Sequence, residues 1–384
     1  MAVTLNALKE PAMPQATPSK VYFANLRARG PKENKLARIA KLFDQAGFKS
    51  LAAKNALTAI KVHFGELGND TFVSPVLIRA VVDRLKKHGA APFLTDTATL
   101  YSGSRHNAVD HLRTASLHGF GPDTAGAPVI IADGLRGNDW REVEIGCKHF
   151  ASVKIASAIL DADAMIAVSH FKGHEMAGFG GAVKNLAMGC SPPAGKRDQH
   201  SPRFEVKQSA CIGCAECLKV CPENAISFAE KKATIDKSTC IGCGECMTVC
   251  ASKAISMDWA TQLGPFTEKM VEYALGAVKG CQGKVGYFNF LVNITPDCDC
   301  VPWSDAPIVP DIGILASFDP VAIDKACLDL VNQQSGLPGS QLAANHGPGE
   351  HKFLGLWKHT LGDLQLSYAE EIGLGSQRYE LVEI

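Results

Sequence analysis

The sequence predicts an α/β protein in which a largely parallel sheet is flanked by helices and a smaller α+β unit interrupts the chain. Three observations lead to this prediction. Short apolar runs alternate with helical stretches of a dozen or so residues, polar clusters follow the ends of several predicted strands, and eight cysteines repeat in register between residues 211 and 250. The first pattern is typical of parallel sheets with helical crossovers.

Predicted strands and helices alternate in the first half of the chain. The strands are Lys20–Leu26, Leu57–Phe64, Pro92–Thr95, Val129–Ala132 and Ala164–Ser169, and the helices are Lys32–Ala46, Val76–His88, His106–His118 and Val153–Leu160. The same alternation resumes after Trp259, with a helix at Thr267–Val278, strands at Lys284–Leu291 and Ile312–Ala316, and a helix at Pro320–Gln334 that has Asp319 or Asp324 near its start.

This resumption predicts one discontinuous α/β domain with an insertion, although two α/β lobes on either side of the insertion are the alternative. We expect a tail at residues 1–19, the first part of the α/β domain at 20–200, the insertion at 201–260 and the second part at 261–384. With 384 residues, of which 46% are hydrophobic, the chain is long enough to bury one large core or two moderate ones.

The cysteines of the insertion form two matching runs of the pattern C-x2-C-x2-C-x3-C. The first run is Cys211, Cys214, Cys217 and Cys221, and the second is Cys240, Cys243, Cys246 and Cys250. This is the run of bacterial two-cluster ferredoxins, in which the fourth cysteine of each run binds the other cluster. We therefore assign one [4Fe–4S] cluster to Cys211, Cys214, Cys217 and Cys250, and a second to Cys240, Cys243, Cys246 and Cys221.

Zinc is the alternative for such cysteines, but a zinc ion takes four ligands, and this repeat supplies two sets. Gly213 and Gly242 inside the runs allow backbone N–H groups to approach the cluster sulfurs. The second run has Ala251 where a proline follows Cys221, a mild departure because proline is not a ligand.

Composition narrows the remaining classes. Lys and Arg balance Asp and Glu at a net charge of +0, so no basic footprint indicates nucleic acid binding. Free thiolates indicate a reducing compartment, the N-terminus has no apolar signal region, and no window is long and apolar enough for a membrane span. We expect a cytoplasmic protein that binds neither nucleic acid nor membrane.

Residues 169–190 form a polar, glycine-rich segment after a predicted strand. His170 and His174 would share one face if the segment were helical, whereas Gly178, Gly180 and Gly181 favour a loop whose N–H groups cradle an anion. Lys172 and Lys184 would add positive charge. A glycine-rich connector with surface histidines is an equally good reading.

Residues 294–300 form a second polar segment after a predicted strand, with Cys298 and Cys300 two positions apart. This C-x-C spacing is tighter than that of a C-x2-C redox dithiol, but along an extended chain the two cysteines would point to the same side. With Cys190 they would supply three thiolates, and His170, His174 or His63 a nitrogen. Such a set suits a third Fe–S cluster with an imidazole ligand, or a mononuclear zinc or iron site. The alternative is that these are buried, inert cysteines, as we expect for Cys147, Cys281 and Cys327.

Several motifs together resemble a known family. They are KVHFGE (61–66), residues 95–111, ADGLRG (132–137), residues 169–190, ITPDCDC (294–300) and SFDPVAID (317–324). The sequence from about Lys20 onward resembles the uncharacterised Fe–S centre proteins, whose main region is a domain of unknown function, number 362. The resemblance implies two cubane clusters and an anaerobic or low-potential setting. Its typical polar positions fall on His63, Glu66, Asp96, Tyr101, Arg105, His106, His170, Lys172, His174, Lys184, Asn185, Cys190, Cys298 and Cys300.

Two functions from different classes follow. In the first, the clusters relay electrons from a soluble ferredoxin- or flavodoxin-type partner to a substrate or metal centre at the strand ends, as in a low-potential reductase. Cys190, Cys298, Cys300 and a histidine would then hold the reactive centre, and Lys172, Lys184 and the glycine-rich backbone would bind an anionic substrate. The candidate catalytic residues are His170, Lys172, His174 and Lys184. In the second, the chain is an accessory that delivers electrons to a partner enzyme or matures its metallocofactor. No P-loop motif supports nucleotide hydrolysis.

Overall fold

The structure is a computed structural model that describes residues 17–101, 103–200, 204–221, 223–240, 246, 249–257 and 259–384. Most of the predicted tail and the predicted cluster ligand Cys243 lie outside these residues. Among the helices that are described, none combines the length and apolar character that crossing a membrane requires.

The α/β body is built on one eight-stranded sheet to which both halves of the chain contribute. In spatial order the strands are β16 (Tyr379–Glu383), β1 (Ser19–Asn25), β15 (Gly313–Ser317), β14 (Val285–Leu291), β7 (Ala164–His170), β2 (Leu57–Val62), β3 (Ala91–Asp96) and β4 (Val129–Ile131). Only β15 runs antiparallel to its neighbours, so the sheet is largely parallel, as the sequence predicted.

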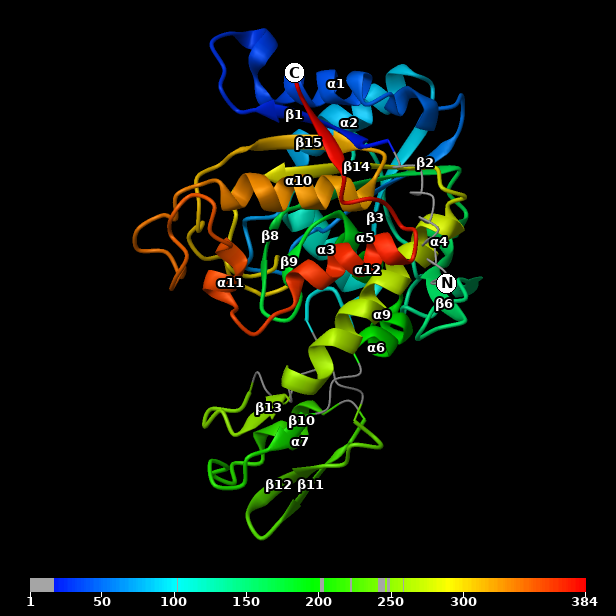
Figure 1. Cartoon of the computed structure of the whole chain (residues 1–384). Coiled ribbons are helices and arrows are strands. Elements are labelled where there is room, and N and C mark those ends of the chain that lie inside the picture. The colour runs from blue at the N-terminus through cyan, green and yellow to red at the C-terminus, as the bar shows by residue number, and fades with distance from the viewer. Residues whose placement is uncertain are drawn as a thin grey trace, which may run out of the picture.

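Helices cover both faces of this sheet (Figure 1). On one side, apolar residues of three helices pack into a core, and these are α1 (Lys35–Gln45), α2 (Pro75–Lys87) and α3 (Ala108–Leu117). On the other side lie α5 (Ala182–Gly189), α9 (Trp259–Gly280), α10 (Pro320–Asn332) and α12 (Gly362–Glu371). Further helices of the α/β body are α4 (Ser157–Leu160), α6 (Pro193–His200) and α11 (Lys352–Leu356).

One predicted helix is wrong. Residues Val153–Leu160 begin with strand β6 (Ser152–Ala156), which pairs antiparallel with β5 (Trp140–Glu144), and only α4 is helical. The side chains of Val153 and Ile155 are buried on either side of the less buried Lys154, a period of two that belongs to a strand. A β-branched pair in this spacing favours the strand over the helix.

The residues between Phe204 and Met257 form a smaller unit, which we call the cysteine unit. It contains α7 (Glu216–Val220) and the strands β10 (Phe204–Val206), β11 (Ile226–Ala229), β12 (Lys232–Ile235) and β13 (Ile255–Met257). Two antiparallel pairs result, β10 with β13 and β11 with β12. Figure 1 shows the unit projecting from the α/β body, next to the end of α6 and the start of α9.

Candidate functional site

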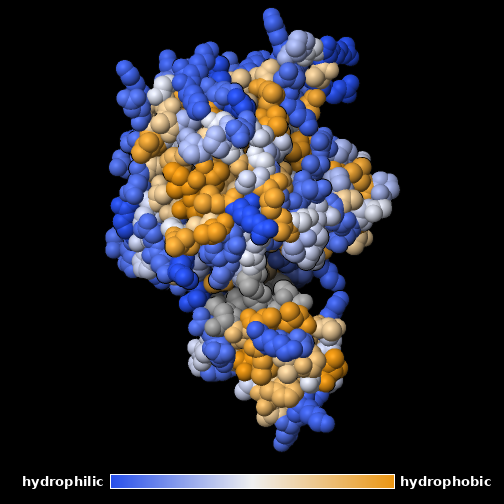
Figure 2. Space-filling view, turned by 180° about the vertical axis from the view of Figure 1, so that it is seen from behind, coloured by the Kyte–Doolittle hydropathy of each residue, from blue (hydrophilic) through white to orange (hydrophobic). Residues whose placement is uncertain are grey.

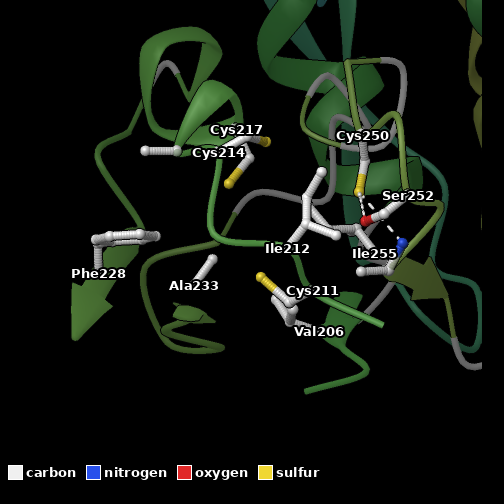
Figure 3. Close-up of a pocket in the computed structure, with 12 residues that line it drawn as sticks. Val206, Cys211, Ile212, Cys214, Cys217, Phe228, Ala233, Cys250, Ser252 and Ile255 are labelled. Atoms are coloured by element: carbon white, nitrogen blue, oxygen red, sulfur yellow. Dashed lines mark hydrogen bonds between the residues drawn. The ribbon is translucent and has the colours of Figure 1, made fainter. Parts of the chain in front are cut away.

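Four cysteines of the cysteine unit line one cavity, and they are the four assigned to one cluster from the sequence. Cys211, Cys214 and Cys217 come from the first run and Cys250 from the second. The cavity encloses about 320 Å³ between the protein atoms, part of it open to solvent. Figure 3 shows the four sulfurs approaching this space from different directions. The rest of the lining is mostly apolar: Val206, Ile212, Ala215, Phe228, Ala233, Ser252, Ala254 and Ile255.

Backbone N–H groups point at sulfurs at matching places in the two halves. Ala225 N donates to Cys221 Sγ and Ala254 N donates to Cys250 Sγ, each over 3.2 Å, so the residue four positions after the last cysteine of each run is the donor. Burial raises the pKa of Cys250, but hydrogen bonds from Ile255, Ser252 and Ala254 outweigh it and leave the pKa lowered. These donors stabilise a thiolate, which is the form that binds iron.

Backbone N–H donors also lower the pKa of a cysteine at the start of the first run. Backbone N–H groups of Ala233 and Gly213 lower the pKa of Cys211. Gly213 has a φ of +73°, and a Cβ there would lie 2.4 Å from the carbonyl oxygen of Lys231. Only glycine fits this left-handed turn and this close approach, so the residue type is required where the chain curves around the cavity.

The second assigned ligand set is only partly described. Cys246 is buried, and Cys221 and Cys240 pack against the main hydrophobic core, whereas Cys243 lies outside the described residues. The structure therefore shows no complete second cavity within the part of the cysteine unit that it describes.

The spacing of the four sulfurs around the cavity bears on the kind of metal they suit. Among the described residues, only His174, Cys298 and Cys300 form a group of three or more candidate ligands whose atoms all lie within 4.8 Å of one another. Sulfurs around one tetrahedral zinc ion would stand roughly 3.8 Å apart, given a Zn–S length of about 2.3 Å. The cavity itself brings together four thiolates from two runs, which is the number of cysteine ligands that a [4Fe–4S] cluster takes.

The α/β body contains a second cysteine site, at the carboxyl ends of the central strands. Cys298 and Cys300 lie in the loop after β14, and His174 is the last residue of β8 (Lys172–His174), which pairs with β9 (Gly178–Gly180). The glycine-rich segment is thus a buried β-hairpin followed by α5, and not the open anion-binding loop or the helix considered from the sequence.

Close backbone packing brings the hairpin to the cysteine loop. Gly173 N donates to Thr295 O over 2.9 Å, and a Cβ at Gly173 would lie 2.2 Å from Pro296 O. Any side chain at Gly173 would therefore push the two segments apart. Because side chains alternate along a strand, Lys172 and His174 project to the same side of β8.

A turn closes around the two cysteines. Val301 N donates to Cys298 O over 3.2 Å, so Cys298 and Cys300 occupy the first and third positions of the turn. Cys298 is buried and Cys300 is partly exposed. Lys184 Nζ, on α5, lies 3.7 Å from Cys298 Sγ.

The two cysteines titrate as a pair. A hydrogen bond from Cys300, together with the charges of Lys184 and Lys172, holds the pKa of Cys298 well below that of an ordinary thiol. Hydrogen bonding with Cys298 and burial raise the pKa of Cys300. Cys298 is therefore the more readily ionised of the two cysteines.

His174 is poorly arranged to complete a metal site here. Its Nδ1 accepts hydrogen bonds from Met176 N and Ala177 N, each over 3.1 Å, so the ring proton sits on Nε2. Neither nitrogen then has a free lone pair for an ion. Metal-binding histidines instead donate their second N–H to an acceptor. The donor set of His174, Cys298 and Cys300 therefore does not fit a resident metal ion in this arrangement.

The other two residues proposed as ligands lie elsewhere. Cys190 Sγ is 4.0 Å from Met165 Sδ in the apolar core, where burial raises its pKa to about 12. His63 accepts from Gly65 N at Nδ1 over 3.0 Å, and its Nε2 lies 3.2 Å from Arg105. Burial and the charge of Arg105 lower the pKa of His63. Neither belongs to the group formed by His174, Cys298 and Cys300.

His170 and Lys172 hold the cysteine loop in place. Asp299, between the two cysteines, accepts from His170 Nδ1 over 2.8 Å and lies 3.2 Å from Lys172 Nζ. Burial opposes its ionisation, yet His170 and Lys172 hold the pKa of Asp299 well below its usual range. The other nitrogen of His170 contacts the carbonyl oxygens of Val292 and Asn293. His170 is therefore a positioning residue, with both nitrogens occupied.

Sequence reasoning missed two charged residues at this edge of the sheet. Glu175 follows His174, and burial raises its pKa to about 7 although its side chain is 39% exposed. Lys61 is fully buried inside β2, where its Nζ lies 3.0 Å from Asp96 and 2.7 Å from Asn185 Oδ1. The signal for Lys61 was a lysine between the apolar Ile60 and Val62 of a predicted strand.

Two further side chains connect this edge to the cysteine loop. Tyr101 donates to Cys300 O over 2.9 Å, and Arg105 donates to Tyr101 over 2.7 Å and to Glu66 over 3.0 Å. Glu66 N in turn donates to Asp299 O over 2.9 Å. His106, which the resemblance also marked, precedes Asn107, the N-cap of α3, and α3 itself begins at Ala108 rather than at His106.

Comparison with known proteins gives one family and two distant structural likenesses. A family model described as a domain of unknown function, DUF362, matches residues 58–329. The lactate racemase apoprotein from Thermoanaerobacterium thermosaccharolyticum aligns with 12% identity and a TM-score of 0.35, over 66% of this chain and 49% of its own. A crystal structure of a protein from Thermotoga maritima aligns with 11% identity and a TM-score of 0.38, over 78% and 60%.

This chain spans about half the length of the first of these structures and 60% of the second. No curated protein matches it. The family model covers well over half of the chain, and so the protein belongs to the DUF362 family.

Proposed function

We propose that this protein is an iron–sulfur redox protein. Two [4Fe–4S] clusters in the cysteine unit exchange single electrons with a soluble partner and pass them to the cysteine site of the α/β body. One cluster is held by Cys211, Cys214, Cys217 and Cys250. The other is held by Cys240, Cys243, Cys246 and Cys221.

The observation that supports the proposal best is that cysteines from both runs line the same cavity. Three of its cysteines come from the first run, and Cys250 comes from the second. This is the crossed pattern of a two-cluster ferredoxin, in which each cluster takes its fourth thiolate from the other half. The N–H donors to Cys221 and Cys250 at equivalent positions support two equivalent halves.

Helix α6 leads from the α/β body to the cysteine unit. Arg197 on α6 forms an ion pair with Glu223 of the cysteine unit, over 3.2 Å. His200 is the last residue of α6. Burial lowers the pKa of both His200 and His174, and the charge of Lys184 is the second largest cause for each. The charge of Lys184 thus acts on His200, at the end of α6, as well as on His174 at the second site.

The surface of the cysteine unit suits a protein partner. Ile212, next to Cys211, is 69% exposed, and Phe228 is 38% exposed, although both also line the cavity. Figure 2 shows apolar side chains gathered on one face of this unit. Exposed apolar residues beside a redox centre are the kind of surface that weak, transient electron-transfer contacts use.

The ligand assignment is tested by single cysteine replacements in anaerobically prepared protein. We expect Cys214→Ala and Cys250→Ala to lose the same cluster signal in electron paramagnetic resonance, and Cys221→Ala and Cys240→Ala to lose the other. Cys147→Ala, outside both runs, serves as the matched control. If Cys214→Ala instead resembled Cys221→Ala, each run would hold its own cluster and the crossed assignment would fall.

The accessory function is the second candidate, and the exposed Ile212 and Phe228 favour it equally. The two are separated by asking what the reduced protein does alone. A reductase consumes a small-molecule acceptor in stoichiometric amounts without another protein. An accessory shows no such turnover and forms a stable complex with one enzyme, which Ile212→Asp would weaken.

A further inference from the structure

We propose that Cys298 and Cys300 form a redox-active dithiol that receives two electrons, one from each reduced cluster. This inference rests on the proposed function, because the clusters supply the electrons. It goes further by naming the acceptor inside the protein and the chemical change there. The pair replaces the third metal centre considered from the sequence.

Geometry allows a disulfide at this place. The Sγ atoms of the two cysteines lie within 4.8 Å of each other, and the turn closed by Val301 N brings their backbones together. Residues two apart cannot exceed a Cα separation of about 7 Å, and disulfides span about 4.4 to 6.8 Å. The sulfur separation and the turn are therefore compatible with a disulfide between Cys298 and Cys300.

The surroundings match the needs of a dithiol. Lys184 Nζ stands 3.7 Å from Cys298 Sγ, and a cation beside a cysteine stabilises the thiolate that attacks or leaves in thiol–disulfide exchange. Lys172 is largely compensated by Asp299, which leaves Lys184 as the main charge that faces the pair. Cys300 is partly exposed, so a substrate or a second thiol can reach it, while Cys298 is shielded.

Electrons and protons balance. The two electrons would come from the two reduced clusters that the cysteines of the two runs would hold, one electron from each. The Cys298–Cys300 sulfur–sulfur bond takes both electrons and breaks, and two protons are taken up to give two thiols, or one proton where Cys298 remains a thiolate beside Lys184. In the reverse direction the dithiol is oxidised to the disulfide and reduces both clusters. No further oxidant or reductant is needed for this step.

A reductive titration tests the step on the intact, cluster-loaded protein. Oxidised protein is titrated under argon with dithionite while the cluster absorbance is followed. The wild type should take up four electrons per molecule, two for the clusters and two for the disulfide. Cys300→Ser should take up two at the same iron content, and Cys327→Ser, which removes a buried cysteine elsewhere, should take up four.

Mass spectrometry of the tryptic peptide 285–325 gives an independent readout, because this peptide contains Cys298 and Cys300 and no other cysteine. When the protein is denatured in the presence of iodoacetamide, this peptide from the oxidised wild type should carry no alkyl group. Its mass should be two hydrogens lower than that of the unmodified dithiol peptide. The reduced protein should carry two alkyl groups. Alkylation of both cysteines in the oxidised, iron-loaded protein would overturn the dithiol and leave the clusters intact.

Two other outcomes also decide the matter. A chelator could remove a metal ion and leave the two cysteines of this peptide as free thiols, with no loss of cluster iron. That result would overturn the dithiol in favour of a metal site. A protein that binds no iron under any anaerobic preparation would overturn the proposed function itself, and the dithiol with it. Equal electron uptake by the wild type and Cys300→Ser at equal iron content would overturn the dithiol alone.

Discussion

Replacing Lys184 by methionine should raise the pH at which the Cys298–Cys300 pair ionises. The ammonium group of Lys184 lies 3.7 Å from Cys298 Sγ, and its charge lowers the pKa of Cys298 more than any other nearby charge does. Methionine keeps much of the length and the apolar stem of lysine and removes the charge. The fold around α5 should survive, because Lys184 is only partly buried.

Coulomb's law bounds the effect. Unit charges 3.7 Å apart attract by about 1 kcal/mol at the dielectric constant of water, and by about 4 kcal/mol at the effective value near 20 that suits protein interiors. An interaction of that size corresponds to about 1 to about 3 pH units in the midpoint of ionisation. The structure therefore predicts a displacement to higher pH that is readily measured.

The assay is the rate of iodoacetamide alkylation of the reduced, native protein as a function of pH, read on peptide 285–325. Lys148→Met is the matched control, because Lys148 is an exposed lysine that forms its ion pair with Glu268. An unchanged midpoint in Lys184→Met would refute the argument that Lys184 governs the pair. A displacement of equal size in Lys148→Met would refute it as well, since the effect would then not be local.

Two further predictions concern the stability of the fold around the site. Asp324 accepts hydrogen bonds from Ala182 N and Val183 N at the start of α5, over 2.7 and 2.9 Å, so Asp324→Ala should cost about 1 to 3 kcal/mol of unfolding free energy and disturb Lys184. Asp319→Ala, which removes the N-cap of α10, should cost about 0.5 to 2 kcal/mol and leave the alkylation profile unchanged, and urea denaturation measures both losses. The second concerns Glu175, whose pKa burial raises to about 7. Because the unfolded carboxyl ionises near pH 4.5, Glu175 stabilises the fold at low pH and this contribution is lost as pH rises through about 7. As the pH is raised from 5 to 8, the urea midpoint of the wild type should decrease relative to that of Glu175→Gln. A difference between the two proteins that stays constant would contradict the raised pKa.

The sequence identified the cysteine unit and the edge of the sheet where the polar residues gather. Periodicity and turn residues sufficed for most central strands, because each buried strand of a parallel sheet is a continuous apolar run, as in β7 and β14. The family resemblance also marked residues that the structure brings together, among them Cys298, Cys300, His174 and Lys184.

What the sequence could not provide were contacts between distant segments. In the hairpin β8–β9, for example, Gly173 packs closely on Pro296, more than a hundred residues later. Asp324 seemed a candidate to start its own helix, but Asp319 has that role and Asp324 instead binds the start of α5. Cys190 ends α5 on the core side of the helix, which no spacing rule distinguishes from a ligand.

The count of iron and sulfide in protein prepared without oxygen tests the central claim most directly. Two [4Fe–4S] clusters predict about eight irons and eight sulfides per chain, a brown colour that dithionite bleaches, and two paramagnetic centres on reduction. A colourless protein that carries zinc in place of iron would contradict the account.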